Sequence, residues 1–258
     1  MKILSFNIWD LPMWHVKDRS DRIKKITDYL KTSDAEIVCL QESFDPRHRK
    51  LIHGEMASAG FASTDKNFES RRVFFRKFDR TGGLAVFSKF PIIKNEFIPF
   101  NRFLSIFSPE YFGRKGMLTA VLQTPRGKII VANTHLYRNF SFFDRFVRHR
   151  QMKKVLDYLN NEKSAPVILA GDFNEDFLAA KENFLKILGE GGFRMFQEEA
   201  APSYRKNNPY NFLLGNSKRY DHIFCRGFES INMKPAGHSV IYTPVPLSDH
   251  DPILLTID

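Results

Sequence analysis

The sequence predicts an α/β protein in which two mixed, mostly antiparallel β-sheets are flanked by helices. Short apolar runs of strand length alternate with longer segments whose apolar residues recur at helical spacing. Two strand-like runs, 117–123 and 128–133, are joined by Pro125-Arg126-Gly127 and predict a hairpin. Because strands and helices mix along the whole chain and several strand pairs are hairpins, we expect sheets covered by helices.

Each element is predicted from a local pattern, taken in chain order. The strands are short apolar runs, and we expect them at 2–8, 36–40, 83–88, 117–123, 128–133, 166–170, 219–225, 237–242 and 253–257. The helices have an apolar face, with Asp18 or Ser20 capping the first and Gly60 ending the second; we expect them at 18–31, 47–59, 142–161 and 177–188. The remaining long stretches are predicted as an exposed loop or hairpin at 64–82, a Phe-rich connection at 96–116 and a loop at 202–218.

Composition and charge limit the class of protein. The chain has 258 residues with 43% hydrophobic residues, which is normal for a packed globular protein. No repeat, low-complexity tract or linker divides it, so we expect one domain over residues 1–258. The net charge of +10 favours anionic partners such as nucleic acid, anionic membrane or a phosphorylated substrate, although solubility alone explains it equally well.

Cysteine use and apolar runs bear on the compartment. Cys39 and Cys225 both lie inside apolar strand-like runs, so we expect buried thiols instead of a disulfide or a metal site. No apolar run reaches the roughly 18 residues of a transmembrane helix, and the chain opens on a strand without a signal-peptide pattern. We therefore expect a soluble, cytoplasmic protein, with secretion by a signal-less route left open. We also expect it to be a monomer.

Polar residues stand at the ends of several predicted strands. Asn7, Glu42 and the Gly171-Asp172-Phe173-Asn174 segment each follow an apolar run, and Ser248-Asp249-His250 comes just before the last strand. Asp249, His250 and Asp251 stand in a row, and ordinary loops rarely place three titratable groups at such a point. We expect these segments, which are far apart in sequence, to meet in one pocket.

The residue types in this set suit hydrolysis of a phosphoester. Carboxylate and amide oxygens are ligands for Mg²⁺, which is typically held by one or two carboxylates and substrate phosphate. His250 can act as a general base if Asp221, which also lies in an apolar strand, orients its ring. Cys/His spacing for zinc and a Gly-rich loop followed by Lys-Ser/Thr are both missing from the sequence.

Each member of the set also has a simpler explanation. Asn7 alone would more often be a hydrogen-bonding residue at a strand end. Glu42 alone would more often be a solvent-exposed residue at a strand end. His135 is as readily a core histidine with satisfied hydrogen bonds, and Asn174 is as readily a helix cap. The combination is much less expected by chance than any one of these residues.

The motifs together resemble the endonuclease/exonuclease/phosphatase superfamily, which has the DNase I-like fold. The resemblance rests on segments in the same order as in that superfamily: Asn7, Gln41-Glu42, Thr134-His135-Leu136, Gly171-Asp172-Phe173-Asn174, Tyr220-Asp221-His222-Ile223 and Ser248-Asp249-His250. Within it, the segments 6–12, 82–92 and 112–116 are most similar to neutral sphingomyelinases. The resemblance implies a four-layer α/β sandwich with the active site at one edge of the two packed sheets.

The resemblance also implies roles for individual residues. Glu42 would bind Mg²⁺ (or Mn²⁺), with Asn7 near the metal and phosphate and Asp249 orienting the metal shell. His250 would be the base, supported by Asp221. The other implied roles are phosphate and water positioning by Asp172 and Asn174, contact with phosphate or assistance to the leaving group by His135, and substrate binding by Lys115 and Arg148.

Three functions follow as alternatives. The favoured one is a Mg²⁺-dependent phosphodiesterase that hydrolyses a phospholipid head group, as sphingomyelinases do, with peripheral membrane contact. A nuclease of the DNase I or abasic-site type is the second, because the basic and aromatic loop 64–80 suits nucleic acid. A binding module without catalysis is the third, and the complete set of acids, amides and histidines argues against it.

Overall fold

The computed structural model of the chain describes the residues 1–65, 70–73, 76–79, 81–100, 114–138, 142–162, 165–176, 186–195, 201–211 and 216–258. Within these residues the strands form two six-stranded sheets and a separate two-stranded hairpin. The first sheet has the strand order β13 (Pro235–Val240), β14 (Ile253–Ile257), β1 (Lys2–Asp10), β2 (Ile37–Ser43), β6 (Ala85–Ser88) and β3 (Ala62–Ser63). The second has the order β11 (Arg194–Met195), β12 (Asp221–Arg226), β10 (Val167–Asp172), β9 (Gly127–His135), β8 (Gly116–Thr124) and β7 (Ile92–Pro99).

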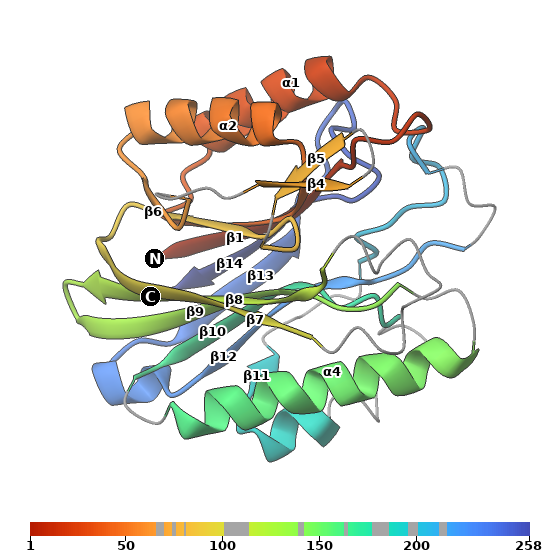
Figure 1. Cartoon of the computed structure of the whole chain (residues 1–258). Helices are drawn as coiled ribbons and strands as arrows, with labels where there is room; N and C mark the ends of the chain where they lie inside the picture. Colours follow the sequence, from red (N-terminus) through yellow and green to blue (C-terminus); the bar gives the residue numbers. More distant parts are fainter. Residues whose placement is uncertain are drawn as a thin grey trace.

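The two sheets pack face to face and helices cover their outer faces (Figure 1). Helices α1 (Arg19–Thr32) and α2 (Pro46–Ser58) cover the first sheet, and α4 (Phe142–Asn161) covers the second. Three buried apolar clusters separate these layers: one between the sheets, one beneath α1 and α2, and one beneath α4. The predicted four-layer α/β sandwich is therefore confirmed.

Both sheets are mixed because each contains a parallel pair at its centre. Strand β1 runs parallel to β2, and β9 runs parallel to β10, whereas β14 and β12 run antiparallel to their neighbours. Parallel strands bring their C-terminal ends to the same edge of a sheet, and an antiparallel neighbour begins at that edge. The topology thus collects the ends of β1, β2, β9 and β10 with the starts of β8, β12 and β14.

Most predicted elements occur within a few residues of their expected positions. The hairpin in the 64–82 segment is β4 (Ser70–Val73) paired with β5 (Arg76–Asp79), and the 117–133 hairpin is β8 with β9. The prediction that 96–116 is only a connection was wrong at its start, because β7 extends to Pro99 and pairs with β8. Strand β7 is an edge strand with an exposed polar middle, Lys94-Asn95-Glu96, so its sequence lacks the apolar run used to find strands.

Other predictions fall partly outside the described residues. Residues 186–190 are helical, as expected for the end of the 177–188 helix, whose remainder is not described. Cys39 and Cys225 are buried free thiols, as predicted. In the part of the chain that the structure describes, no helix has the length and apolarity needed to cross a bilayer.

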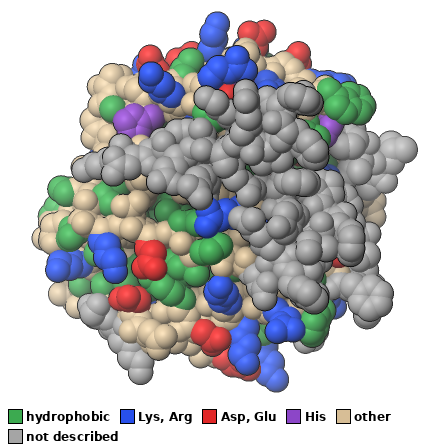
Figure 2. All heavy atoms as spheres, viewed as in Figure 1, with side chains coloured by type: hydrophobic (Ala, Val, Ile, Leu, Met, Phe, Trp, Pro, Cys, Tyr) green, Lys and Arg blue, Asp and Glu red, His purple; other side chains and the backbone are tan. Residues whose placement is uncertain are grey.

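Charged side chains are scattered over the described part of the face shown in Figure 2. On the face shown in Figure 2, the described Lys and Arg side chains lie among Asp and Glu over several elements and do not form one continuous basic surface. The net charge of +10 therefore is not concentrated in a single stripe among the described side chains of this face.

Candidate active site

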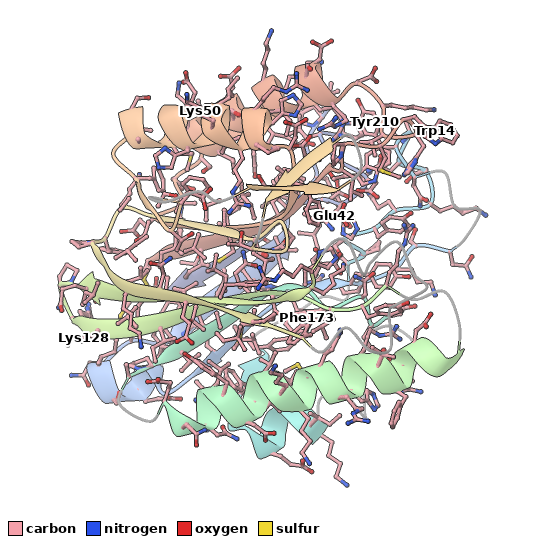
Figure 3. All side chains as sticks on the ribbon, in the orientation of Figure 1. Trp14, Glu42, Lys50, Lys128, Phe173 and Tyr210 are labelled. Atoms are coloured by element: carbon pink, nitrogen blue, oxygen red, sulfur yellow. The ribbon has the colours of Figure 1, made fainter. Side chains whose placement is uncertain are left out.

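The predicted polar residues meet at one edge of the sandwich because of strand register. Asp172 and His135, the last residues of β10 and β9, are opposite each other, and Asp221, the first residue of β12, is opposite Asp172. Ser5 of β1 pairs with Ile253 of β14, so His250 lies beside the end of β1 where Asn7 is found. Glu42 and Phe173 lie toward this end of the sheets in Figure 3, and Lys128 lies at the other.

The backbone is unusual at two of these residues. Glu42 has φ 58° and Asn174 has φ 50°, both in the left-handed region that non-glycine residues adopt rarely. Such strain persists when surrounding structure fixes it and is common at functional sites. Gly171 meets a different requirement, since a Cβ atom there would be 1.9 Å from the carbonyl oxygen of Thr134 on the neighbouring strand.

Buried amides support the floor of the site. Asn7 donates from Nδ2 to Oδ2 of Asp172 at 2.9 Å, which joins the two sheets directly. Gln41, next to Glu42, donates to the hydroxyl of Ser5 and to Oδ1 of Asn133. Asn133 in turn donates to the carbonyl oxygens of Leu40 and Ala85. These hydrogen bonds fix the ends of β1, β2 and β9 relative to one another.

His250 and Asp221 form a tight pair. Nδ1 of His250 is 2.7 Å from Oδ2 of Asp221, and both residues are buried. The other ring nitrogen, Nε2, is 3.8 Å from Oδ2 of Asp172 and faces the centre of the site. A histidine held through Nδ1 by a carboxylate has Nε2 available to accept a proton.

His135 and Lys115 lie on the opposite side of Asp172. Nε2 of His135 is 3.4 Å from Oδ2 of Asp172 and 3.7 Å from Oε1 of Glu42. The Nζ atom of Lys115, one residue before β8, is in hydrogen-bond contact with the same Nε2. The acidic groups of Asp172 and Glu42 therefore lie within a few ångströms of the basic groups of His135 and Lys115.

Burial and mutual repulsion perturb the acids. Burial raises the pKa of Asp172 to about 6, and the Asp221 carboxylate adds to this effect. Burial also raises the pKa of Asp249 to about 6 and raises that of Glu42. Burial alone would lower the pKa of His250, but the Asp221, Asp249 and Asp172 carboxylates raise it well above its usual value.

The acids that line the site fit a divalent cation. Oε2 of Glu42 is buried and accepts no hydrogen bond from the described residues, so a ligand position is open. Uncompensated buried carboxylates are costly, and a bound cation would reverse that cost. Asp172, Asp221 and His250 also bring ligand atoms within 4.8 Å of one another. Since Asp221 and His250 bind each other, we favour Glu42 as the principal ligand.

The other predicted residues have distinct placements. Asn174 donates its backbone N–H to Oδ1 of Asp172 at 2.8 Å and its side-chain amide to the Leu136 carbonyl, and both acceptors lie at the site. Asp249 is buried and accepts a hydrogen bond from Ser248. Glu42 contributes to the raised pKa of Asp249, as expected for carboxylates that are close together.

Arg148 requires a correction. Its side chain is only 2% exposed and its guanidinium is paired with the buried carboxylate of Glu175, at 2.7 Å and 2.8 Å. A guanidinium used in this way does not face substrate, so the prediction that Arg148 binds substrate does not agree with its position. Glu175 follows Asn174 directly, and the ion pair therefore fixes the segment that carries Asn174 to α4.

Sequence reasoning did not identify Arg138. This half-buried residue follows β9 by three positions, and its positive charge affects the pKa of Glu42, His135 and Asp249 together. A cation that influences all three groups is near the mouth of the site. The only available signal was its spacing from Thr134-His135-Leu136.

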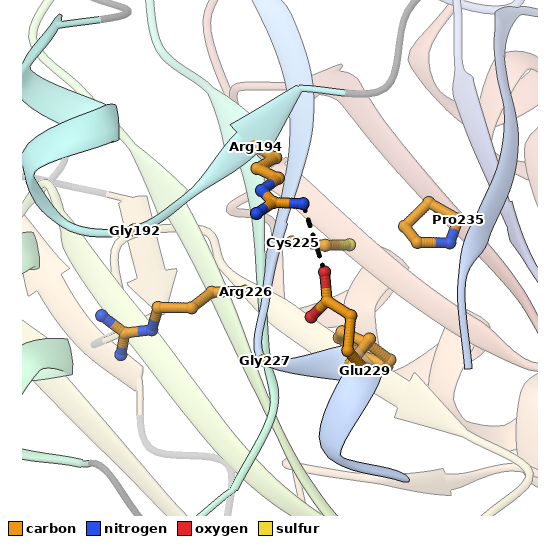
Figure 4. Close-up of a pocket in the computed structure, with 8 residues that line it drawn as sticks. Gly192, Arg194, Cys225, Arg226, Gly227, Glu229 and Pro235 are labelled. Atoms are coloured by element: carbon orange, nitrogen blue, oxygen red, sulfur yellow. Dashed lines mark hydrogen bonds and ion pairs between the residues drawn. The ribbon is translucent and has the colours of Figure 1, made fainter. Parts of the chain in front are cut away.

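A small cavity elsewhere is a poor alternative site. It has a volume of about 70 Å³ and lies between η2 (Phe228–Ile231) and β11, where Arg194 and Glu229 form an ion pair (Figure 4). Ligand pockets for organic molecules have volumes of about 300 Å³ or more. None of the residues that line this cavity belongs to the predicted set.

Comparison with known proteins identifies the family. A model of the endonuclease/exonuclease/phosphatase family matches residues 4–250. An inositol phosphosphingolipids phospholipase C of Schizosaccharomyces pombe is 31% identical over 199 residues, which cover 73% of this chain and 44% of that protein. Sphingomyelinase C 2 of Leptospira interrogans is 26% identical over 193 residues, 67% of this chain and 30% of that protein. This chain therefore spans less than half the length of either relative.

The fold agrees with these matches. The crystal structure of sphingomyelinase C from Streptomyces griseocarneus has a TM-score of 0.77 to this chain at 20% identity and covers 98% of both chains. The motifs, the edge of the sandwich at which they meet and the family match all lead to one assignment. The chain belongs to the endonuclease/exonuclease/phosphatase family and lies close to its sphingomyelinase branch.

Proposed function

We propose that this protein is a Mg²⁺-dependent phosphodiesterase that hydrolyses the head group of a phospholipid of the sphingomyelin type. The observation that carries the proposal is the meeting of the Glu42, Asp172 and Asp249 carboxylates with the His250–Asp221 pair at one sheet edge. Oxygen ligands suit Mg²⁺, and Mn²⁺ can replace it.

The chain's own residues divide the work of hydrolysis. His250 accepts a proton from water at Nε2, and Asp221 stabilises the imidazolium that forms. Lys115 and Asn7 are N–H donors that would face the charged phosphoryl oxygens, and such preorganised donors stabilise the transition state. His135, whose Nε2 accepts a hydrogen bond from Lys115, would orient that ammonium group beside the phosphate. Glu42 would hold the metal, with Asp249 and Asn7 beside it. When bound, the ion supplies neutralisation of phosphate charge and of the leaving oxygen.

Two sequence relatives support a lipid substrate. Their names describe a phospholipase C acting on inositol phosphosphingolipids and a sphingomyelinase C. Both substrates are sphingolipids with a phosphodiester head group, and that chemistry fits the site. We also propose that the protein acts as a monomer in the cytoplasm, with peripheral contact to a membrane surface.

A head-group release assay tests this function. Mixed micelles of sphingomyelin, phosphatidylcholine or an inositol phosphosphingolipid are incubated with Mg²⁺, Mn²⁺ or a chelator, and the released phosphorylated head group is measured. We expect turnover that requires metal and that His250→Ala abolishes, whereas the control His53→Ala on α2 keeps it. If no phosphodiester lipid is turned over with either metal, the lipid proposal is wrong.

A nuclease is the second candidate, because the net charge of +10 and the basic β4–β5 hairpin suit a phosphate backbone. Nicking of supercoiled plasmid by the same variants separates the two. Nicking that His250→Ala removes, without lipid turnover, would favour the nuclease. Intact plasmid together with lipid turnover would reject it.

A further inference from the structure

The Asp221 carboxylate is held through one of its two oxygens. Oδ2 accepts a hydrogen bond from Nδ1 of His250 at 2.7 Å and another from the hydroxyl of Ser203 at 2.6 Å. Oδ1 is buried and accepts none from the described residues. A carboxylate bound by one oxygen keeps its orientation only while both donors to that oxygen remain. The direction in which Asp221 faces His250 therefore depends on Ser203.

The hydroxyl of Ser203 is itself fixed in direction. Its Oγ accepts hydrogen bonds from the backbone N–H groups of Tyr220 at 3.2 Å and Asp221 at 3.1 Å. A serine hydroxyl has one donor and two acceptor positions. With both acceptor positions occupied, its single hydrogen is directed at Oδ2 of Asp221, and no rotation improves its contacts. The residue is fully buried, so water does not compete for these bonds.

The segment 203–204 also contacts His250 from two other directions. The carbonyl oxygen of Ser203 accepts the backbone N–H of Asp251 at 2.7 Å, which anchors the residue directly after His250. The ring of Tyr204 packs edge-on against the imidazole, with ring centroids 5.1 Å apart. Tyr204 is held in turn by its hydroxyl, which donates to Oδ1 of Asn211 at 2.6 Å.

We propose that Ser203 is a positioning residue for the general base, which orients Asp221 so that His250 keeps its proton on Nδ1 and directs Nε2 toward the reacting water. The inference rests on the proposed function and adds to it a residue that touches neither substrate nor metal. It also explains why a serine with no apparent chemistry of its own is fully buried beside Asp221 and the residue after His250.

The test is a double-mutant cycle with a matched control. Loss of one hydrogen bond to a charged group corresponds to a decrease in kcat of about 10- to 100-fold for Ser203→Ala. KM is expected to stay constant, and Ser203→Thr is expected to restore part of the rate. In an Asp221→Ala background, Ser203→Ala is expected to change kcat less than about twofold, since the group it orients is absent. The control, Ser88→Ala, removes another fully buried serine hydroxyl, one that accepts a backbone N–H far from the site.

A second measurement does not depend on turnover. A hydrogen-bonded Nδ1 proton of His250 gives a proton NMR signal protected from exchange, which we expect in the wild type and in Ser88→Ala, and which we expect Ser203→Ala to broaden. An equal loss of kcat by Ser203→Ala in both backgrounds, or an unchanged Nδ1 signal in Ser203→Ala, would overturn the proposal. If the wild type cleaves no phosphodiester but the signal responds as expected, the function fails while the positioning role stands.

Discussion

Asp221→Asn tests the proposed base most directly. Asp221 is buried, and Oδ2 receives the Nδ1 proton of His250 at 2.7 Å. An amide nitrogen at that position would donate to Nδ1 and leave the proton on Nε2, where it blocks acceptance from water. The equivalent change in a serine protease triad lowers kcat by about 10⁴. We expect a loss of roughly 10³ to 10⁴, or about 4 to 5.5 kcal/mol of transition-state stabilisation.

The same variant has a defined effect on the pH profile. Burial alone would lower the pKa of His250, but nearby carboxylates raise it, and Asp221 has the largest effect among them. In the wild type His250 therefore loses its proton only at a pH above the ordinary pKa of histidine. Activity should therefore rise with pH through that raised pKa. Asp221→Asn removes the carboxylate, so the acidic limb of kcat/KM should move to lower pH while the plateau falls. The assay is head-group release from pH 5 to 9 at saturating Mg²⁺.

A matched variant shows whether the effect is specific. Asp28→Asn changes an exposed carboxylate on α1 and should keep both the plateau and the limb. A plateau for Asp221→Asn within tenfold of the wild type would refute the assignment of His250 as an Asp221-supported base. An acidic limb that moved to higher pH would contradict the electrostatic reasoning even if the rate fell.

Three further predictions concern metal, pH and packing. Mg²⁺ should stabilise the wild type by about 2.7 kcal/mol at a concentration 100 times its Kd, and Glu42→Gln should remove most of that gain in thermal unfolding with and without chelator. Burial lowers the pKa of His222 well below its usual value, so the unfolded chain binds more protons below about pH 6.5. Stability is thus lost as pH falls, and in urea titrations His222→Phe should reduce this slope by about 1.4 kcal/mol per pH unit. Arg148→Met removes one of the two arginine partners of the buried Glu175, because Arg145 remains 3.3 Å from it; we expect a loss of about 1.5 to 3 kcal/mol in the free energy of unfolding, measured by urea titration.

Sequence pattern located the layers of the fold and the composition of the site. Strands buried on both faces, such as β1, β2 and β10, are mostly apolar over most of their length, so short apolar runs identified them. Edge strand β7 has no such signal because its middle residues are exposed and polar. Strands β3 and β11 have none because each is only two residues long. The α4 prediction matched the observed Phe142–Asn161, since a long helix repeats its apolar face many times.

Roles were harder to predict than positions. Arg148 and Lys115 are both basic residues in segments that resemble family motifs. Arg148 is buried in an ion pair with Glu175, whereas Lys115 contacts His135 in the site. Sequence carries the identity of a side chain but not the direction in which it points. Ser203 is the opposite case, a residue with a proposed role in a segment that carries no sequence motif. Its segment looked like an ordinary loop, and only the contacts with Asp221 and Asp251 distinguish it.

The topology also separates the chemistry from the choice of substrate. Asn7, Glu42, His135 and Asp172 are on strands whose positions are fixed by registers in both sheets, so their geometry cannot drift without breaking the core. The chain leaves the sheets at this edge after β7, β9 and β10, and connections at such an edge commonly determine specificity. Substitutions in the connections should therefore exchange one phosphodiester for another while the requirement for His250 and for metal persists. A family with this fold can act on lipids or nucleic acids without rebuilding its strands, because bond cleavage and substrate recognition depend on different parts of the chain.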